Sequence, residues 1–102
     1  MNLEQAIDFL EQSWDRDAGF LGRVRSGDFD SDLGARFLER LKTLEPCEGD
    51  EISRRLVALL WYVPIFLEWQ TERVKEKGHD LDEYKRSANS ILSVVEDYLG
   101  IP

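Results

Sequence analysis

The stretch that decides the fold is Leu56-Val57-Ala58-Leu59-Leu60-Trp61-Tyr62-Val63-Pro64-Ile65-Phe66-Leu67, twelve consecutive residues without a charge. It lies within a longer segment, Ile52 to Val74, that we expect to form one helix. A helix that is apolar on every side must be surrounded by other elements or offer a face to a partner. The first alternative predicts a central helix with Leu60 and Trp61 in the core. Pro64 leaves the carbonyl of Leu60 without its usual donor, so the helix should bend there.

Four aromatic residues lie close together on this segment, and they are Trp61, Tyr62, Phe66 and Trp69. At about 100° per residue, Tyr62, Phe66 and Trp69 share one face of the helix. This face is either core under neighbouring helices or a partly exposed patch. Tyr and Trp are favoured interface anchors, because they combine a large apolar area with a polar tip. Tyr62, Phe66 and Trp69 are therefore candidate partner-binding residues.

Apolar residues at three- and four-residue spacing predict further helices. In chain order, the expected elements are a helix over residues 3–15, a short helical piece near 20–24, and helices over 32–44 and 80–100. Asn2 with Gln5, and Asp80 with Glu83, predict capping boxes at the first and last of these helices. No run alternates with period two, so strands are not expected. The sequence predicts an all-α single domain over residues 1–102, a compact bundle of four main helices plus one short helix around the Pro-containing helix.

Acidic residues follow the helical spacing on the first helix, beside its apolar stripe. They are Glu4, Asp8, Glu11 and Asp15, and we call them the acidic ridge. On an ideal helix they fall within about 60° of one another. Like charges at this spacing destabilise a helix by a few tenths of a kcal/mol each. The acidic ridge is either a solvated face or a docking surface for a basic partner.

Carboxylates also alternate in the loop over residues 28–34. With Asp28 as position 1 of a calcium loop, Asp30 and Asp32 fall at positions 3 and 5, and Glu39 falls at position 12. Position 6 requires glycine, and the chain has Leu33 there. The pattern therefore predicts an acidic loop in which one of residues 30–32 caps the next helix. We expect no metal site and no cofactor.

Cys47 and His79 are each the single residue of their type. Cys47 lies among carboxylates, which disfavour the reactive thiolate, and no ligand-like spacing surrounds His79. An enzyme needs convergent titratable groups, whereas the acids of this chain lie on predicted surface faces. The sequence therefore predicts a protein that is not an enzyme.

The charge balance favours a protein partner. The net charge is −8 over 102 residues, with 12 acids and 6 bases in residues 1–50 (net −6) and 9 acids and 7 bases in residues 51–102 (net −2). This balance repels nucleic acid and attracts a basic protein. A lone cysteine, the lack of a signal-peptide pattern and an apolar run too short to span a bilayer predict a cytoplasmic protein without membrane association.

In size, acidity and helical make-up, the whole chain resembles the small immunity proteins that bacteria make against their own nuclease toxins. Some of these carry a Tyr-Tyr-Pro element, to which Trp61-Tyr62-Val63-Pro64 is similar, with one residue inserted before the proline. The resemblance implies a protein that binds a basic toxin and neutralises it without chemistry of its own. The alternative is a structural or regulatory domain that self-associates through the helix aromatics. We therefore expect a monomer or a weak homodimer.

Overall fold

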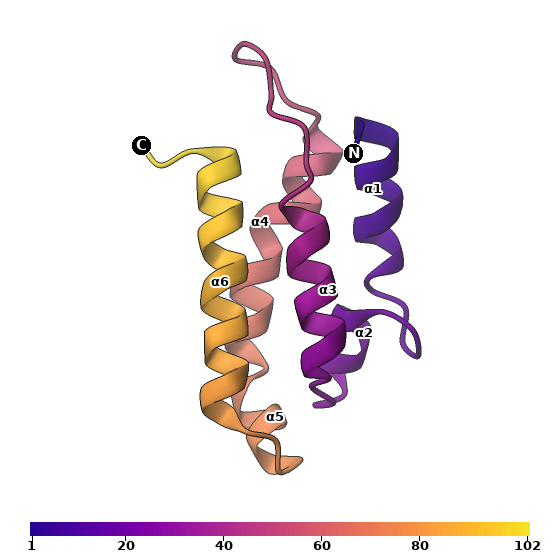
Figure 1. Cartoon of the computed structure of the whole chain (residues 1–102), viewed down its shortest axis with the longest axis vertical. Coiled ribbons are helices and arrows are strands. Elements are labelled where there is room, and N and C mark those ends of the chain that lie inside the picture. The colour runs from indigo at the N-terminus through magenta and orange to yellow at the C-terminus, as the bar shows by residue number, and fades with distance from the viewer.

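The computed structural model describes all residues 1–102 and is entirely helical, with 67% of the residues in helices and no strands. This confirms the predicted all-α class. The elements, shown in Figure 1, are α1 Leu3–Gln12, α2 Phe20–Arg25, α3 Ser31–Leu41, α4 Arg54–Trp69, α5 Thr71–Glu76 and α6 Leu81–Leu99. The long helices run alternately down and up the molecule. None of them has the length and apolar character that crossing a membrane requires.

Most helices begin where the sequence supplies a side-chain cap. Asn2 accepts a hydrogen bond from the Gln5 N–H at 2.9 Å, and the Gln5 side chain accepts one from the Asn2 N–H at 3.0 Å, which confirms the predicted capping box. Asp30, Ser53 and Asp80 cap α3, α4 and α6, each accepting a backbone N–H three residues on, but the return bond from Glu83 that would complete the predicted capping box at Asp80 is not formed. Each cap satisfies an N–H group that the helix itself leaves without a partner, so local sequence determines these starts.

The predicted single helix from Ile52 to Val74 is wrong. The segment forms two helices, α4 and α5, which meet at Gln70. α4 runs through Pro64 without interruption, so the break comes six residues after the proline. The missing hydrogen bond of a single proline is therefore not what ends this helix.

Contacts from other side chains explain the break. The Tyr84 hydroxyl of α6 donates to the carbonyl of Leu67, and the Thr71 hydroxyl donates to the carbonyl of Glu68 at 2.7 Å. These donors compete with the backbone N–H groups that would continue α4. One of them comes from a distant part of the chain, so the end of α4 depends on tertiary packing.

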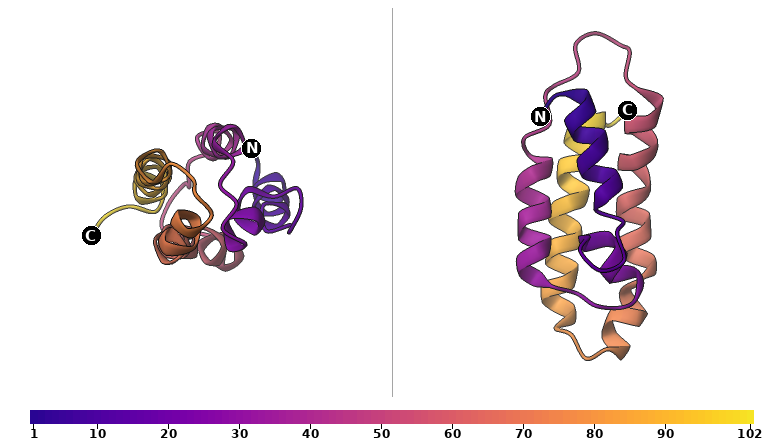
Figure 2. Two further views of the ribbon diagram at one scale, coloured as in Figure 1. Left: turned by 90° about the horizontal axis from the view of Figure 1, so that it is seen from below. Right: turned by 90° about the vertical axis from the view of Figure 1, so that its right-hand side faces the viewer.

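The core lies between α1, α3, α4 and α6, which the two views of Figure 2 show side by side. α6 packs against both α3 and α4, and α1 packs against α4. Eighteen buried apolar residues from these elements and their connections form one cluster. Leu10, Leu60 and Ile91 have no exposed surface, which confirms the prediction that Leu60 is a core residue.

α4 packs against other helices on one side only, and its other side is exposed to solvent. The prediction that Trp61 is a core residue is wrong, because 51% of its surface is exposed. Its neighbour Leu60 is fully buried. Consecutive helical residues point about 100° apart, so a helix packed on one side buries one of them and exposes the other.

α2 confirms the short helix expected near residues 20–24, and a close backbone approach holds it against the end of α1. The Gly22 N–H donates to the carbonyl of Ser13 at 3.0 Å. A Cβ at Gly22 would lie 2.0 Å from the carbonyl oxygen of Asp15, so only glycine fits. This packing brings Arg25 to the edge of α4, over the ring of Trp14.

Candidate protein-binding surface

The side of α4 that faces away from the core is apolar. Trp61 is 51% exposed and Trp69 is 67% exposed, while Tyr62 and Ile65 are half-buried beside them. We define the α4 outer face by these residues and one small exposed residue: Ala58, Trp61, Tyr62, Ile65 and Trp69. Large apolar side chains grouped on one exposed surface are typical of interaction sites.

Helical geometry places the two apolar faces of α4 on opposite sides. Leu60, Val63 and Leu67 have no exposed surface and point to the core. Trp61 and Trp69 are separated by eight residues, so they lie within about 80° of each other on the opposite side. This relation is present in the sequence, and it would have identified Trp61 as an outer-face residue.

A layer of aromatic side chains supports the α4 outer face. The Tyr62 ring lies 5.8 Å from the ring of Trp61 and 6.2 Å from that of Trp69, centroid to centroid. Beneath it, Trp14 packs edge-on against Phe66 at 4.6 Å. These contacts restrict the side-chain rotations of the exposed rings, which lowers the entropy cost of using them as anchors.

The candidate residues Tyr62, Phe66 and Trp69 therefore divide by exposure. Tyr62 and Trp69 have surface that a partner can contact. Phe66 is only 3% exposed, so it offers a partner almost no surface. Trp14 and Arg25 cover it, with the Arg25 guanidinium 5.8 Å from the Phe66 ring centre. Neither residue is near Phe66 in the sequence, so its burial depends on the fold.

The acidic ridge is exposed but is not one continuous helical row. Glu4 and Asp8 lie on α1 and form no ion pair. Glu11 pairs with Arg55 of α4 at 3.1 Å. Asp15 lies beyond the end of α1, where its carboxylate accepts the backbone N–H groups of the following turn. Of the four acids, only Glu4 and Asp8 form neither an ion pair nor a side-chain hydrogen bond, and they lie on α1, which packs against α4.

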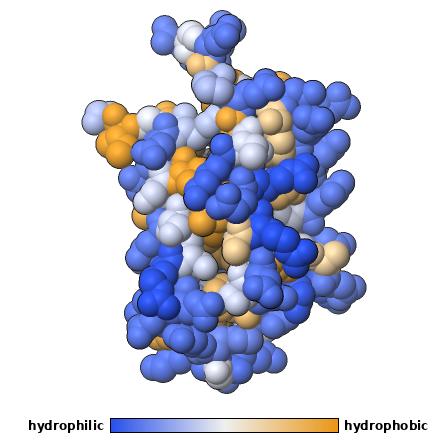
Figure 3. Space-filling model, viewed as in Figure 1, coloured by the Kyte–Doolittle hydropathy of each residue, from blue (hydrophilic) through white to orange (hydrophobic).

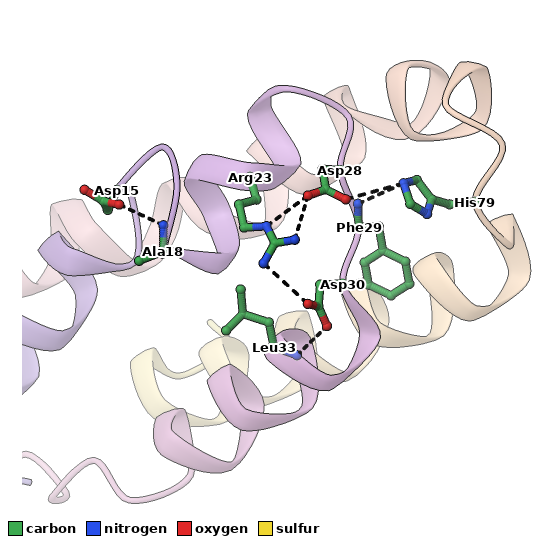
Figure 4. A network of polar contacts seen from close by, with 8 residues as sticks. All are labelled: Asp15, Ala18, Arg23, Asp28, Phe29, Asp30, Leu33 and His79. Carbon is green, nitrogen blue, oxygen red and sulfur yellow. Dashed lines mark hydrogen bonds and ion pairs between the residues drawn. The ribbon is translucent and has the colours of Figure 1, made fainter.

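The acidic loop over residues 28–34 has a structural role, shown in Figure 4. Arg23 pairs with Asp28 at 2.8 Å and with Asp30 at 3.4 Å. The hydrogen bond and charge of Asp28 raise the pKa of the Arg23 guanidinium. Asp30 caps α3, which confirms the predicted capping role of residues 30–32. The carboxylates at positions 1 and 3 of the supposed calcium loop thus already have protein partners.

His79 joins the same network from the turn before α6. Its Nε2 accepts the backbone N–H of Phe29 at 3.3 Å and lies 3.7 Å from the Asp28 carboxylate. The Phe29 ring is buried against Tyr84. His79 therefore connects the loop before α3 to the turn before α6, and its contacts are those of a structural residue.

The loop between α3 and α4 is held to α6 by Tyr98. The Tyr98 hydroxyl donates to the carbonyl of Glu45 at 2.9 Å, and the Cys47 thiol donates to the same hydroxyl at 3.2 Å. Burial, followed by the bond with Cys47, raises the pKa of Tyr98 to about 12. Cys47 thus stabilises a loop contact.

The face formed by α3 and α6 differs from the α4 outer face. Figure 3 shows that hydrophilic residues cover most of this face, with apolar atoms visible mainly in the gaps between them. The groove between α3 and α6 is lined by the exposed Arg86 and by Glu83. The exposed tryptophans are thus a local feature of α4 and do not reflect a generally apolar surface.

Comparison of the chain with protein-family models, curated proteins and solved structures gives no match. The class that the fold defines is a small all-helical domain with one exposed aromatic helix face.

Proposed function

We propose that this chain is a four-helix bundle, extended by α2 and α5, that works as a protein-binding module and captures a basic protein. The observation that carries the proposal is the exposure of Trp61 and Trp69 on a well-packed helix. Exposed tryptophans lose contact with water when a partner covers them, and such residues dominate binding energies. The five aromatic and aliphatic residues of the face provide an apolar centre for an interface.

Charge supports a basic partner. The chain has a net charge of −8, and Glu4 and Asp8 are exposed without an ion pair on α1, which packs against α4. Acids at the rim of an interface accelerate the approach of a positively charged protein. The resemblance to bacterial immunity proteins makes a nuclease-type toxin the partner class that we propose. The module would cover or distort the active surface of the toxin without performing chemistry.

The test is capture of a basic protein from the source cells, followed by association kinetics with the identified protein. Trp61→Ala with Trp69→Ala should abolish capture, because it removes the apolar anchors. Arg36→Glu on α3 is a matched surface control and should leave capture unchanged. Capture that survives the loss of both tryptophans would contradict the assignment of the α4 outer face.

A second variant separates anchoring from steering. Glu4→Lys with Asp8→Lys should slow association strongly at low salt and weakly at high salt, because salt screens charges beyond about 10 Å at 0.1 M. Glu76→Lys with Asp82→Lys makes the same change in net charge at the far end of the molecule. If both variants slow association equally, the net charge and not the acidic ridge steers the partner.

A further inference from the structure

We propose that the α4 outer face also binds a second copy of this chain, with the two α4 helices antiparallel about a two-fold axis near Trp61 and Tyr62. This inference rests on the premise of the proposed function that the α4 outer face is an interface. A second copy of the chain covers that face when no other protein is bound.

Charges at the two ends of α4 favour this arrangement. Arg54 lies at the start of α4 and Glu68 near its end; both are exposed, and neither forms an ion pair within the chain. They are separated by about 21 Å along the helix. In an antiparallel pair about this axis, Arg54 of each copy lies within one residue of the position opposite Glu68 of the other. A parallel pair would instead place like charges together, which is unfavourable.

The sizes of the outer-face residues are complementary in the same arrangement. Ala58 and Ile65 are equally far from the midpoint between Trp61 and Tyr62, on opposite sides of it. The two-fold axis therefore places the small Ala58 of one copy opposite the larger Ile65 of the other. In an isologous interface each such contact occurs twice, so one favourable pair contributes at two places.

The available area fits a reversible dimer. With 51% and 67% of their surfaces exposed, Trp61 and Trp69 together supply about a third of the roughly 800 Å² per partner that a standard interface buries. Tyr62, Ile65 and the charged residues at the ends of α4 supply a further part. The interface is therefore small for an obligate dimer, and a basic protein that binds the same tryptophans would displace the second copy.

Sedimentation velocity of the full chain over a micromolar concentration series tests the inference. The wild-type chain should change from monomer to dimer as its concentration rises. Arg54→Glu places carboxylates opposite each other at both ends of the interface, and Glu68→Arg places guanidinium groups there. Each variant alone should weaken the dimer by about tenfold or more. An equal mixture of the two variants should restore association, because every pair across the interface is then of opposite charge.

Three further variants complete the test. The double variant Arg54→Glu with Glu68→Arg should dimerise like wild type if the helices are antiparallel. Arg36→Glu makes the same charge change as Arg54→Glu, but on α3, and should have no effect. Trp61→Ala should weaken the dimer by about tenfold or more, and circular dichroism checks that this variant is folded. If Trp61→Ala does not fold, the charge variants of Arg54 and Glu68 still test the dimer.

The inference is overturned if the wild-type chain remains monomeric at every soluble concentration. It is also overturned if single charge variants dimerise like wild type, because another face or a parallel pairing would then be used. A monomeric chain that captures a basic protein through Trp61 and Trp69 would leave the proposed function standing and this inference refuted. A dimer that follows the predicted pattern but captures no basic protein would support this inference and refute the proposed function.

Discussion

The inner and outer faces of α4 are both apolar, yet they have different roles. Leu60 and Val63 are completely buried, whereas Trp61 is half exposed, one residue after Leu60. The inner face contributes to the free energy of folding, because its atoms leave water when the domain forms. The apolar atoms of the outer face stay in contact with water in the folded chain, so they contribute less to folding and are accessible to a partner. Hydrophobicity along a sequence therefore does not distinguish the core from an interface until the neighbouring elements are known.

The largest contrast is expected from alanine substitutions at adjacent positions. Leu60→Ala should lower the free energy of unfolding by about 2–5 kcal/mol, because it leaves a cavity in a packed core. Urea denaturation followed by circular dichroism measures this change. If Leu60→Ala lowers the free energy of unfolding less than Trp61→Ala does, the assignment of Leu60 to the inner face and Trp61 to the outer face is wrong.

A smaller loss is expected at the end of the inner face. Tyr84→Phe removes the hydroxyl that donates to the carbonyl of Leu67, which is buried. The expected cost is about 1–2 kcal/mol, the range for losing one buried hydrogen bond. Hydrogen exchange should show faster opening around Gln70 in the variant. If the protection at Gln70 is unchanged, the contact from α6 does not determine where α4 ends.

Tyrosine ionisation gives a pH dependence. Burial raises the pKa of Tyr84, and burial together with Cys47 raises that of Tyr98 to about 12. An unfolded tyrosine ionises near about pH 10. Between about pH 10 and pH 12 the unfolded chain releases tyrosine protons that the folded chain retains. The contribution of these two tyrosines to the free energy of unfolding is therefore fully present below about pH 10 and is lost as the pH rises toward 12.

Denaturant midpoints of the wild-type chain at about pH 9 and about pH 11 should show this decrease. In Tyr98→Phe the decrease should be smaller, because one of the two shifted hydroxyls is gone. Equal decreases in both proteins would show that Tyr98 does not contribute to the pH dependence.

The smallest effect on stability is expected on the outer face. Trp61→Ala and Trp69→Ala should each lower the free energy of unfolding by only about 0.5–1.5 kcal/mol, the range for one aromatic pair, because each ring packs against Tyr62 and not in the core. The same variants should lose binding to a partner or to a second copy. A stability loss close to that of Leu60→Ala would make Trp61 a folding residue after all.

Much of the fold could be predicted from local chemistry. The all-α class, the capping box of Asn2 and Gln5, and the burial of Leu60 follow from spacing and from caps that act within a few residues. The exposure of the candidate site residues could be predicted only in part. Tyr62 and Trp69 are accessible, whereas Phe66 is covered by Trp14 and Arg25, which lie more than 40 positions away in the sequence.

The sequence by itself determined where most helices begin, because a cap is a contact between a side chain and a backbone N–H three residues away. Tertiary structure decided where α4 ends, because the donor to Leu67 comes from Tyr84 on another helix. It also decided which apolar side of α4 is covered. Two other long helices, α1 and α6, pack against one side of α4 and leave Trp61 and Trp69 exposed on the other.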